Sequence, residues 1–199
     1  MRHIFNLLLI FIVCSLQLSA QTSNYQKLLD TAITTTNSIY VSASPIKTIR
    51  LNRSEMWDYY NNYIEDSKQM LDTIMFAQII QNSKQPDTSP WKDSELEKMI
   101  LVKSREEPVD VSYVAFKFNI KDNKQLKNYR KMIDGFNSLN SADKNIYSYS
   151  RPVFDNSKQF AIVQWDNGNG KSAGGGGIIL FQLSGDSWEE LGSVLTWKY

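Results

Sequence analysis

The stretch QFAIVQWDNGNGKSAGGGGIILFQL, Gln159 to Leu183, decides the fold. It contains two apolar runs rich in β-branched and aromatic residues, which is typical of strands, and a glycine-rich segment joins them. A similar run, SYSRPVF, precedes this stretch across the turn sequence DNSK, and WEELGSVLTWKY follows across SGDS. Four such runs in succession predict an antiparallel β-meander at the C-terminus.

Upstream of the meander, apolar residues recur at helical spacing. NYQKLLDTAITTTNSIY and DNKQLKNYRKMIDGFNSL each predict an amphipathic helix. Ser54, as N-cap, opens a longer stretch that predicts either one helix or two helices with a break near Asp66. The apolar face expected for this stretch consists of Trp57, Tyr60, Ile64, Leu71, Ile74, Met75 and Ile79.

The remaining segments predict short elements. Ile46 to Leu51 follows Pro45 and suggests a short strand, and VSYVAFKFNI, Val111 to Ile120, alternates as a strand does. WKDSELEKMILVKSREEP predicts a short capped helix that runs into a strand or a second turn. The expected fold class is therefore α+β, with N-terminal helices packed on a C-terminal antiparallel β-meander, and residues 21–199 form one domain.

Residues 1–20 have the features of a signal peptide. Arg2 and His3 precede the apolar run Ile4 to Val13, and small residues precede a cut after Ala20. Alternatives are a lipoprotein modified at Cys14 and an uncleaved N-terminal anchor. No later run approaches the roughly 20 apolar residues of a spanning helix, so we expect no transmembrane segment after cleavage. The sequence predicts an exported protein, either periplasmic or extracellular.

Removal of this leader would change the available chemistry. His3 and Cys14 are the only histidine and cysteine of the chain, and one of the 22 basic residues is also lost, which leaves 21 against 21 acidic residues. A chain without thiol or imidazole has no disulfide and no Ser-His-Asp or Cys-His machinery. We expect no metal site of the zinc, copper or haem type and no cofactor. A neutral chain also argues against a nucleic-acid partner.

The glycine-rich segment has features of two kinds of site, a phosphate-binding loop and a calcium-binding loop, and lacks a required residue of each. Gly170-Lys171-Ser172 resembles the end of a phosphate-binding loop, but Trp165 stands where the first glycine of that motif belongs. Asp166 does not head an EF-hand, because Gly177 occupies the position of the bidentate glutamate. Weak calcium binding, a plain connector and a partner-contact loop remain as alternatives. The candidate binding residues here are Trp165, Asp166, Asn167, Asn169 and Lys171.

The stretch WDYYNNY, Trp57 to Tyr63, contains four aromatic residues and suggests a platform for a sugar or a peptide. Helical spacing turns Trp57 and Tyr60 inward, toward the core. Tyr59 and Tyr63 lie beside that face and are therefore the candidate binding residues of this stretch.

The C-terminal third also carries a resemblance. The residues concerned are YSRPVFDNSKQFAIVQW, then GGGG, IILFQL and DSWEELGSVLTW. This pattern resembles a group of exported bacterial proteins, common in Bacteroidota, whose function is unassigned. The resemblance covers residues 147–199 and implies a β-meander and bacterial export, but no activity. Many members carry a cysteine pair in the glycine loop, and this chain has none there.

Three hypotheses about function follow. The first is a secreted or periplasmic, non-enzymatic protein that acts by protein–protein contact with a partner in the cell envelope, as an inhibitor or immunity protein does. Its expected contact surface is the loop Gly168 to Gly177. The second is a carboxylate-dependent enzyme acting on glycans, which needs two carboxyl groups about 5–10 Å apart in a cleft. The third is a ligand-binding module with an aromatic cavity between the helices and the sheet.

Overall fold

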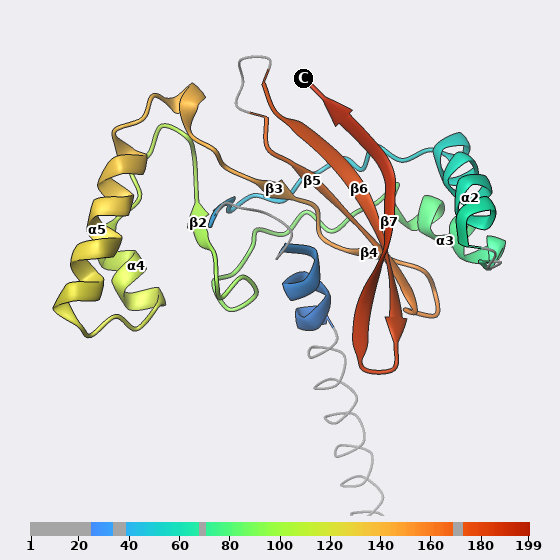
Figure 1. Ribbon diagram of the computed structural model, residues 1–199, viewed down its shortest axis with the longest axis horizontal. Helices are drawn as coiled ribbons and strands as arrows, with labels where there is room; N and C mark the ends of the chain where they lie inside the picture. Colours follow the sequence, from blue (N-terminus) through green and yellow to red (C-terminus); the bar gives the residue numbers. More distant parts are fainter. Residues whose placement is uncertain (1–24, 34–38, 68–70, 169–172) are drawn as a thin grey trace, which may run out of the picture.

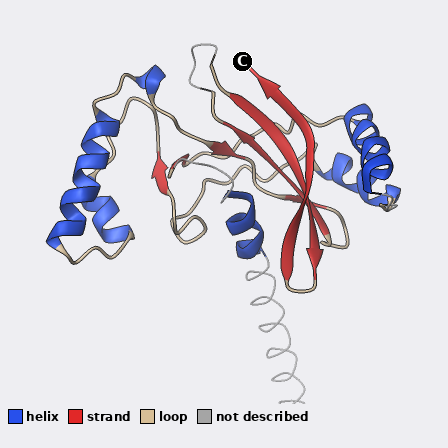
Figure 2. Ribbon diagram, viewed as in Figure 1, coloured by secondary structure: helices blue, strands red, loops and turns tan. Residues whose placement is uncertain are grey.

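The computed structural model describes residues 25–33, 39–67, 71–168 and 173–199. The chain is an α+β protein, as predicted, with its α-helices in the N-terminal part and an antiparallel sheet at the C-terminus (Figure 2). After a helix over residues 25–33, the elements are β1 (Tyr40–Ser42), α2 (Arg53–Ser67), α3 (Thr73–Asn82), β2 (Ile100–Val102), α4 (Val111–Lys117), α5 (Asn123–Asn137), a 3-10 turn η1 (Ser141–Asp143), β3 (Ser148–Tyr149), β4 (Val153–Phe154), β5 (Phe160–Asp166), β6 (Gly175–Ser184) and β7 (Ser187–Lys198).

The meander predicted from the sequence is confirmed. Its strands follow the order β3-β5-β6-β7, and the short β4 also pairs with β5. β5 runs antiparallel to β6 from the pair Phe160–Gln182 to the pair Asp166–Gly176. β1 and β2 form a separate parallel pair, which a bridge between Val41 and Tyr147 joins to the segment before β3. In Figure 1 the long strands β6 and β7 cross the centre of the molecule, with α2 and α3 at one end and α4 and α5 at the other.

Side chains of the central strands bury both faces of the sheet. Ala161 and Val163 of β5 point to one core cluster, which the helix over residues 25–33 covers, and Ile162 points to the opposite cluster under α2 and α3. Successive residues of a strand face opposite sides. Because both sides are buried, the strand reads in the sequence as a continuous apolar run. A third cluster forms between β1, β2, α4 and α5, around Val114 and Ile133.

Three predicted elements differ in the structure. Val111–Lys117 is the helix α4 and not a strand, because Asp110 caps it by accepting a 2.8 Å hydrogen bond from the backbone N–H of Ser112. The strand expected at Ile46–Leu51 is absent, and the strand of this region is β1, at residues 40–42. No helix forms in residues 91–99, which are turns leading into β2.

The stretch after Asn52 forms two helices, which was one of the two alternatives. The N-cap is Asn52 and not Ser54: Asn52 Oδ1 accepts from the N–H of Glu55 at 3.1 Å, and Glu55 Oε2 accepts from the N–H of Asn52 at 2.8 Å. Tyr60 is buried as expected, whereas Ile74 is 64% exposed, contrary to its predicted inward position. Within the described ranges, no helix is both long and apolar enough to cross a bilayer.

Candidate functional site

The predicted residues at the end of β5 hold the base of the glycine loop together. Asp166 Oδ1 accepts from the N–H of Gly168 at 2.8 Å, and Asp166 Oδ2 accepts from the hydroxyl of Tyr199 at 2.6 Å. Asn167 Oδ1 accepts from the N–H of Gly175 at 2.7 Å. The partly buried ring of Trp165 lies 6.0 Å from that of Tyr147. These three side chains therefore make internal contacts, and Asn169 and Lys171 lie outside the described residues.

The last glycines of the segment belong to the sheet. Strand β6 begins with Gly175, Gly176 and Gly177. The last two of these glycines pair with both β5 and β7. A Cβ atom on Gly176 would overlap the ring of Trp197 and would lie 2.7 Å from the carbonyl oxygen of Trp165. Glycine is required here because two neighbours approach its backbone closely.

Sequence reasoning missed Arg50 in this region. Its guanidinium lies 4.8 Å from the centroid of the Trp197 ring, and Nη2 donates a 3.3 Å hydrogen bond to the hydroxyl of Tyr199. This hydrogen bond and the cation–π contact join the segment before α2 to the C-terminus, and the Tyr199–Asp166 hydrogen bond joins the C-terminus to the end of β5. No sequence pattern could indicate this contact, because 149 positions separate Arg50 from Tyr199.

The other two predicted residues, Tyr59 and Tyr63, line a cleft. It lies between α2 and the outer strand β7, has a volume of about 460 Å³ and is open to solvent on one side. Leu191 and Val194 of β7 give it apolar surface, and Ser193 gives it a hydroxyl. Its full lining is Asp58, Tyr59, Asn62, Tyr63, Asp66, Leu191, Ser193 and Val194. A volume of this size suits a small ligand.

The α2 wall of the cleft consists of two parallel columns. Residues four apart on a helix lie above one another on the same face, at about 6 Å between their Cβ atoms. Tyr59 and Tyr63 form the aromatic column, with ring centroids 5.8 Å apart and planes inclined by 29°. Asp58, Asn62 and Asp66 form the polar column; all three are exposed, and none has a hydrogen-bond or ion-pair partner among the described residues.

The tyrosine hydroxyl at the inner end of the cleft stays protonated. Tyr59 Oη donates a 3.0 Å hydrogen bond to the carbonyl oxygen of Leu191. Burial, assisted by nearby Tyr63 and Glu190, raises the pKa of Tyr59 well above its usual value. Negative charge in the cleft comes from Asp58 and Asp66, and its described lining contains no cation. The cleft is thus acidic, aromatic and rich in unused hydrogen-bond acceptors.

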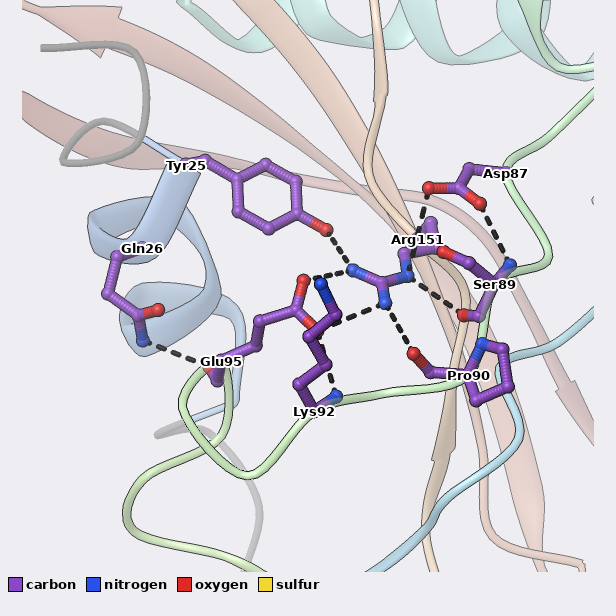
Figure 3. Close-up of polar contacts among 8 residues, drawn as sticks. All are labelled: Tyr25, Gln26, Asp87, Ser89, Pro90, Lys92, Glu95 and Arg151. Atoms are coloured by element: carbon purple, nitrogen blue, oxygen red, sulfur yellow. Dashed lines mark hydrogen bonds and ion pairs between the residues drawn. The ribbon is translucent and has the colours of Figure 1, made fainter. Parts of the chain in front are cut away.

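A buried arginine, Arg151, is the centre of a cluster of polar contacts, which Figure 3 shows. The guanidinium of Arg151 donates to both carboxylate oxygens of Glu95, to the hydroxyl of Tyr25 and to the carbonyl oxygens of Ser89 and Pro90. A guanidinium has five N–H donors, and all five are used. Arg151 therefore fastens the N-terminal helix and the 87–95 segment to the sheet, and it has no donor left for a ligand.

A second cavity, of about 490 Å³, lies between residues 91–93, β2 and α4. Trp91 lines it, and its indole N–H is buried without a hydrogen-bond partner in the described part of the chain. Two of its charged side chains are already engaged: Asp93 pairs with Lys117 at 2.6 Å, and Asp110 caps α4. Among the described residues, no group of three acidic, histidine or cysteine side chains could hold a metal ion.

Comparisons with known proteins do not extend these observations. No protein-family model matches the chain, and neither the curated proteins nor the solved structures give a match. The resemblance of residues 147–199 to exported bacterial proteins stays a prediction.

Proposed function

We propose that this chain is a non-catalytic binding protein that takes a short saccharide, neutral or amino-bearing, in the cleft between α2 and β7. One observation carries the proposal: the aromatic column Tyr59–Tyr63 runs beside a column of three polar side chains that have no partner among the described residues. A sugar ring has an apolar C–H face that packs on flat rings and a rim of hydroxyl groups that donate to carboxylate and amide oxygens.

Charge supports this ligand class over anionic ones. Asp58 and Asp66 would repel a phosphate, a sulfate or a uronic acid, and no cation among the described lining residues offsets them. They accept hydrogen bonds from neutral hydroxyl groups and would attract an amino group. Leu191 and Val194 of β7 supply the apolar wall that such small-molecule sites usually have.

The spacing of the two carboxyl groups supports binding over glycoside hydrolysis. Asp58 and Asp66 are eight residues apart on one helix, which separates them by about 12 Å along its axis. Paired catalytic carboxyl groups stand about 5–5.5 Å apart in retaining enzymes and about 6.5–9.5 Å apart in inverting enzymes. The separation of Asp58 and Asp66 is wider than either arrangement, which supports binding of a sugar over its cleavage.

The test is a titration of the isotope-labelled protein with neutral, amino and acidic trisaccharides, monitored by nuclear magnetic resonance. We expect at least one neutral or amino trisaccharide to shift the resonances of Tyr59, Tyr63 and Asn62, and an acidic one, trigalacturonate, to leave them unchanged. Absence of any shift with the whole panel at millimolar concentration, or shifts confined to the cavity at Trp91, would overturn the proposal.

Export of the protein to the periplasm or out of the cell is also a proposal. Residues 1–20, which suggest it, lie outside the described ranges. The protein-contact hypothesis has less support at the glycine loop: Trp165, Asp166 and Asn167 are occupied by internal contacts, and Asn169 and Lys171 are not described.

A further inference from the structure

We propose that the outward face of α5 is a docking surface for an acidic polysaccharide. This inference is independent of the cleft between α2 and β7. The helices α2 and α5 lie at opposite ends of the molecule (Figure 1). Five cationic side chains on or directly before α5 are exposed to solvent: Lys121, Lys124, Lys127, Arg130 and Lys131.

The two faces of α5 differ sharply. Ile133 and Phe136 are buried in the core cluster formed with α4, β1 and β2. Lys124, Lys127 and Lys131 follow at steps of three and four residues, so they share the opposite face over two turns, or about 10 Å. Asp134 interrupts this face at its C-terminal end, yet neither Arg130 nor Lys131 forms an ion pair with it in the described structure.

Elsewhere the chain uses several of its cations to hold the structure together. Lys117 pairs with Asp93, and Arg151 with Glu95. Arg105 donates to the carbonyl oxygen of Lys144 at 2.6 Å, and Arg50 stacks on Trp197. The five cations of α5 have no such role among the described contacts, although the chain as a whole carries a net charge of only +1. Positive charge is therefore concentrated on one free helix face.

The form of this face favours an acidic polysaccharide over two other polyanions. A helix that lies in a membrane surface inserts its apolar side, and the apolar side of α5 is already packed in the core. Single-stranded nucleic acid is usually held by stacking on aromatic rings, but neither aromatic ring of α5 itself is free: Tyr129 is stacked on Phe118, with ring centroids 5.5 Å apart, and Phe136 is buried. A flexible chain with regularly spaced carboxylate or sulfate groups needs only a row of cations.

The test compares two triple variants with equal loss of charge. One is Lys124→Gln, Lys127→Gln and Lys131→Gln, and the matched control is Lys47→Gln, Lys98→Gln and Lys158→Gln, all exposed lysines outside α5. Binding to polygalacturonate and to dextran sulfate is measured at 50 and 200 mM salt. Gln has nearly the helix propensity of Lys, so circular dichroism should show both variants folded.

We expect the wild-type chain to bind at 50 mM salt and to lose most of its affinity at 200 mM. The α5 variant should bind roughly tenfold more weakly or worse, and the control within about twofold of wild type. Equal losses in both variants, no binding of the wild type at 50 mM salt, or tighter binding to anionic phospholipid vesicles or to single-stranded DNA than to either polysaccharide would overturn the proposal.

Discussion

The hydroxyl of Tyr59 donates a 3.0 Å hydrogen bond to the backbone carbonyl of Leu191, and this bond joins α2 to the outer strand β7. The two residues are 132 positions apart in the chain and both line the same cleft. The carbonyl of an outer strand would otherwise bond to water. Because Tyr59 occupies it, the helix is held against the sheet and the cleft has a fixed inner wall.

Removal of this hydroxyl should weaken the link between helix and sheet. We expect Tyr59→Phe to lower the free energy of unfolding by about 1 kcal/mol, since the Leu191 carbonyl loses its donor. The control is Tyr147→Phe, because the Tyr147 hydroxyl has no hydrogen-bond partner among the described residues. Urea unfolding followed by tryptophan fluorescence measures both changes, and equal stability of the two variants would show that the bond contributes nothing.

The ion pair between Arg151 and Glu95 should make the free energy of unfolding depend on pH in the acidic range. Burial acts to raise the pKa of Glu95, but hydrogen bonds from Arg151 and Lys92 outweigh it and hold that pKa below its usual value. A carboxyl group with a lower pKa in the folded state adds stability that is complete above its unfolded pKa of about 4.3 and is lost as the pH falls through the folded pKa. The free energy of unfolding of the wild type should therefore decline below about pH 4.3.

Glu95→Gln tests this contribution. At pH 7 the variant should lose on the order of 3 kcal/mol, because the buried Arg151 keeps its charge, loses its closest carboxylate and retains only the exposed Asp87, 3.9 Å away. Its stability should also fall less steeply than that of the wild type below about pH 4.3. The matched control is Glu97→Gln, an exposed side chain two residues further on, for which we expect a change within about 0.5 kcal/mol. Identical acid unfolding curves for the two variants would contradict the assignment.

Two glycine substitutions should act in opposite directions. Gly176→Ala places a methyl group against the Trp197 ring and the Trp165 carbonyl, and we expect a loss of about 1–3 kcal/mol. Gly135→Ala lies within α5, with no atom within 4 Å of the new Cβ, and should stabilise the protein by about 0.5–1 kcal/mol. Thermal unfolding measures both, and a neutral Gly176→Ala would contradict the close packing at the start of β6.

The sequence predicted the meander because its central strands, β5 and β6, are apolar runs rich in β-branched residues, and clear turn signals lie on either side of this pair. It predicted α5 because Tyr129, Ile133 and Phe136 recur at helical spacing. It failed for α4, where apolar residues stand on both sides of the segment and fit either period. The decisive signal was Asp110, whose side chain caps the helix and which sequence reasoning overlooked. The short strands β1 and β2 pair with each other although α2 and α3 lie between them in the sequence. No local sequence pattern reveals such pairing.

The candidate site was foreseen only in part. Tyr59 and Tyr63 were selected for their aromatic rings, and both line the cleft between α2 and β7. Asn62 could have been found with them, because it follows Asp58 at the four-residue step that places side chains on one helix face. Leu191 could not, since its position depends on the packing of α2 against β7.

The most direct test of the proposed function uses the adjacent asparagines of α2. Asn62 lines the cleft, whereas Asn61, one position earlier, does not. The trisaccharide that binds the wild type most tightly is titrated calorimetrically into Asn62→Leu and Asn61→Leu. We expect Asn62→Leu to weaken binding roughly tenfold, since one hydrogen bond to the sugar is lost, and Asn61→Leu to bind within about twofold of wild type. Equal affinity of both variants, or no binding of any trisaccharide to the wild-type chain, would contradict a saccharide site in this cleft.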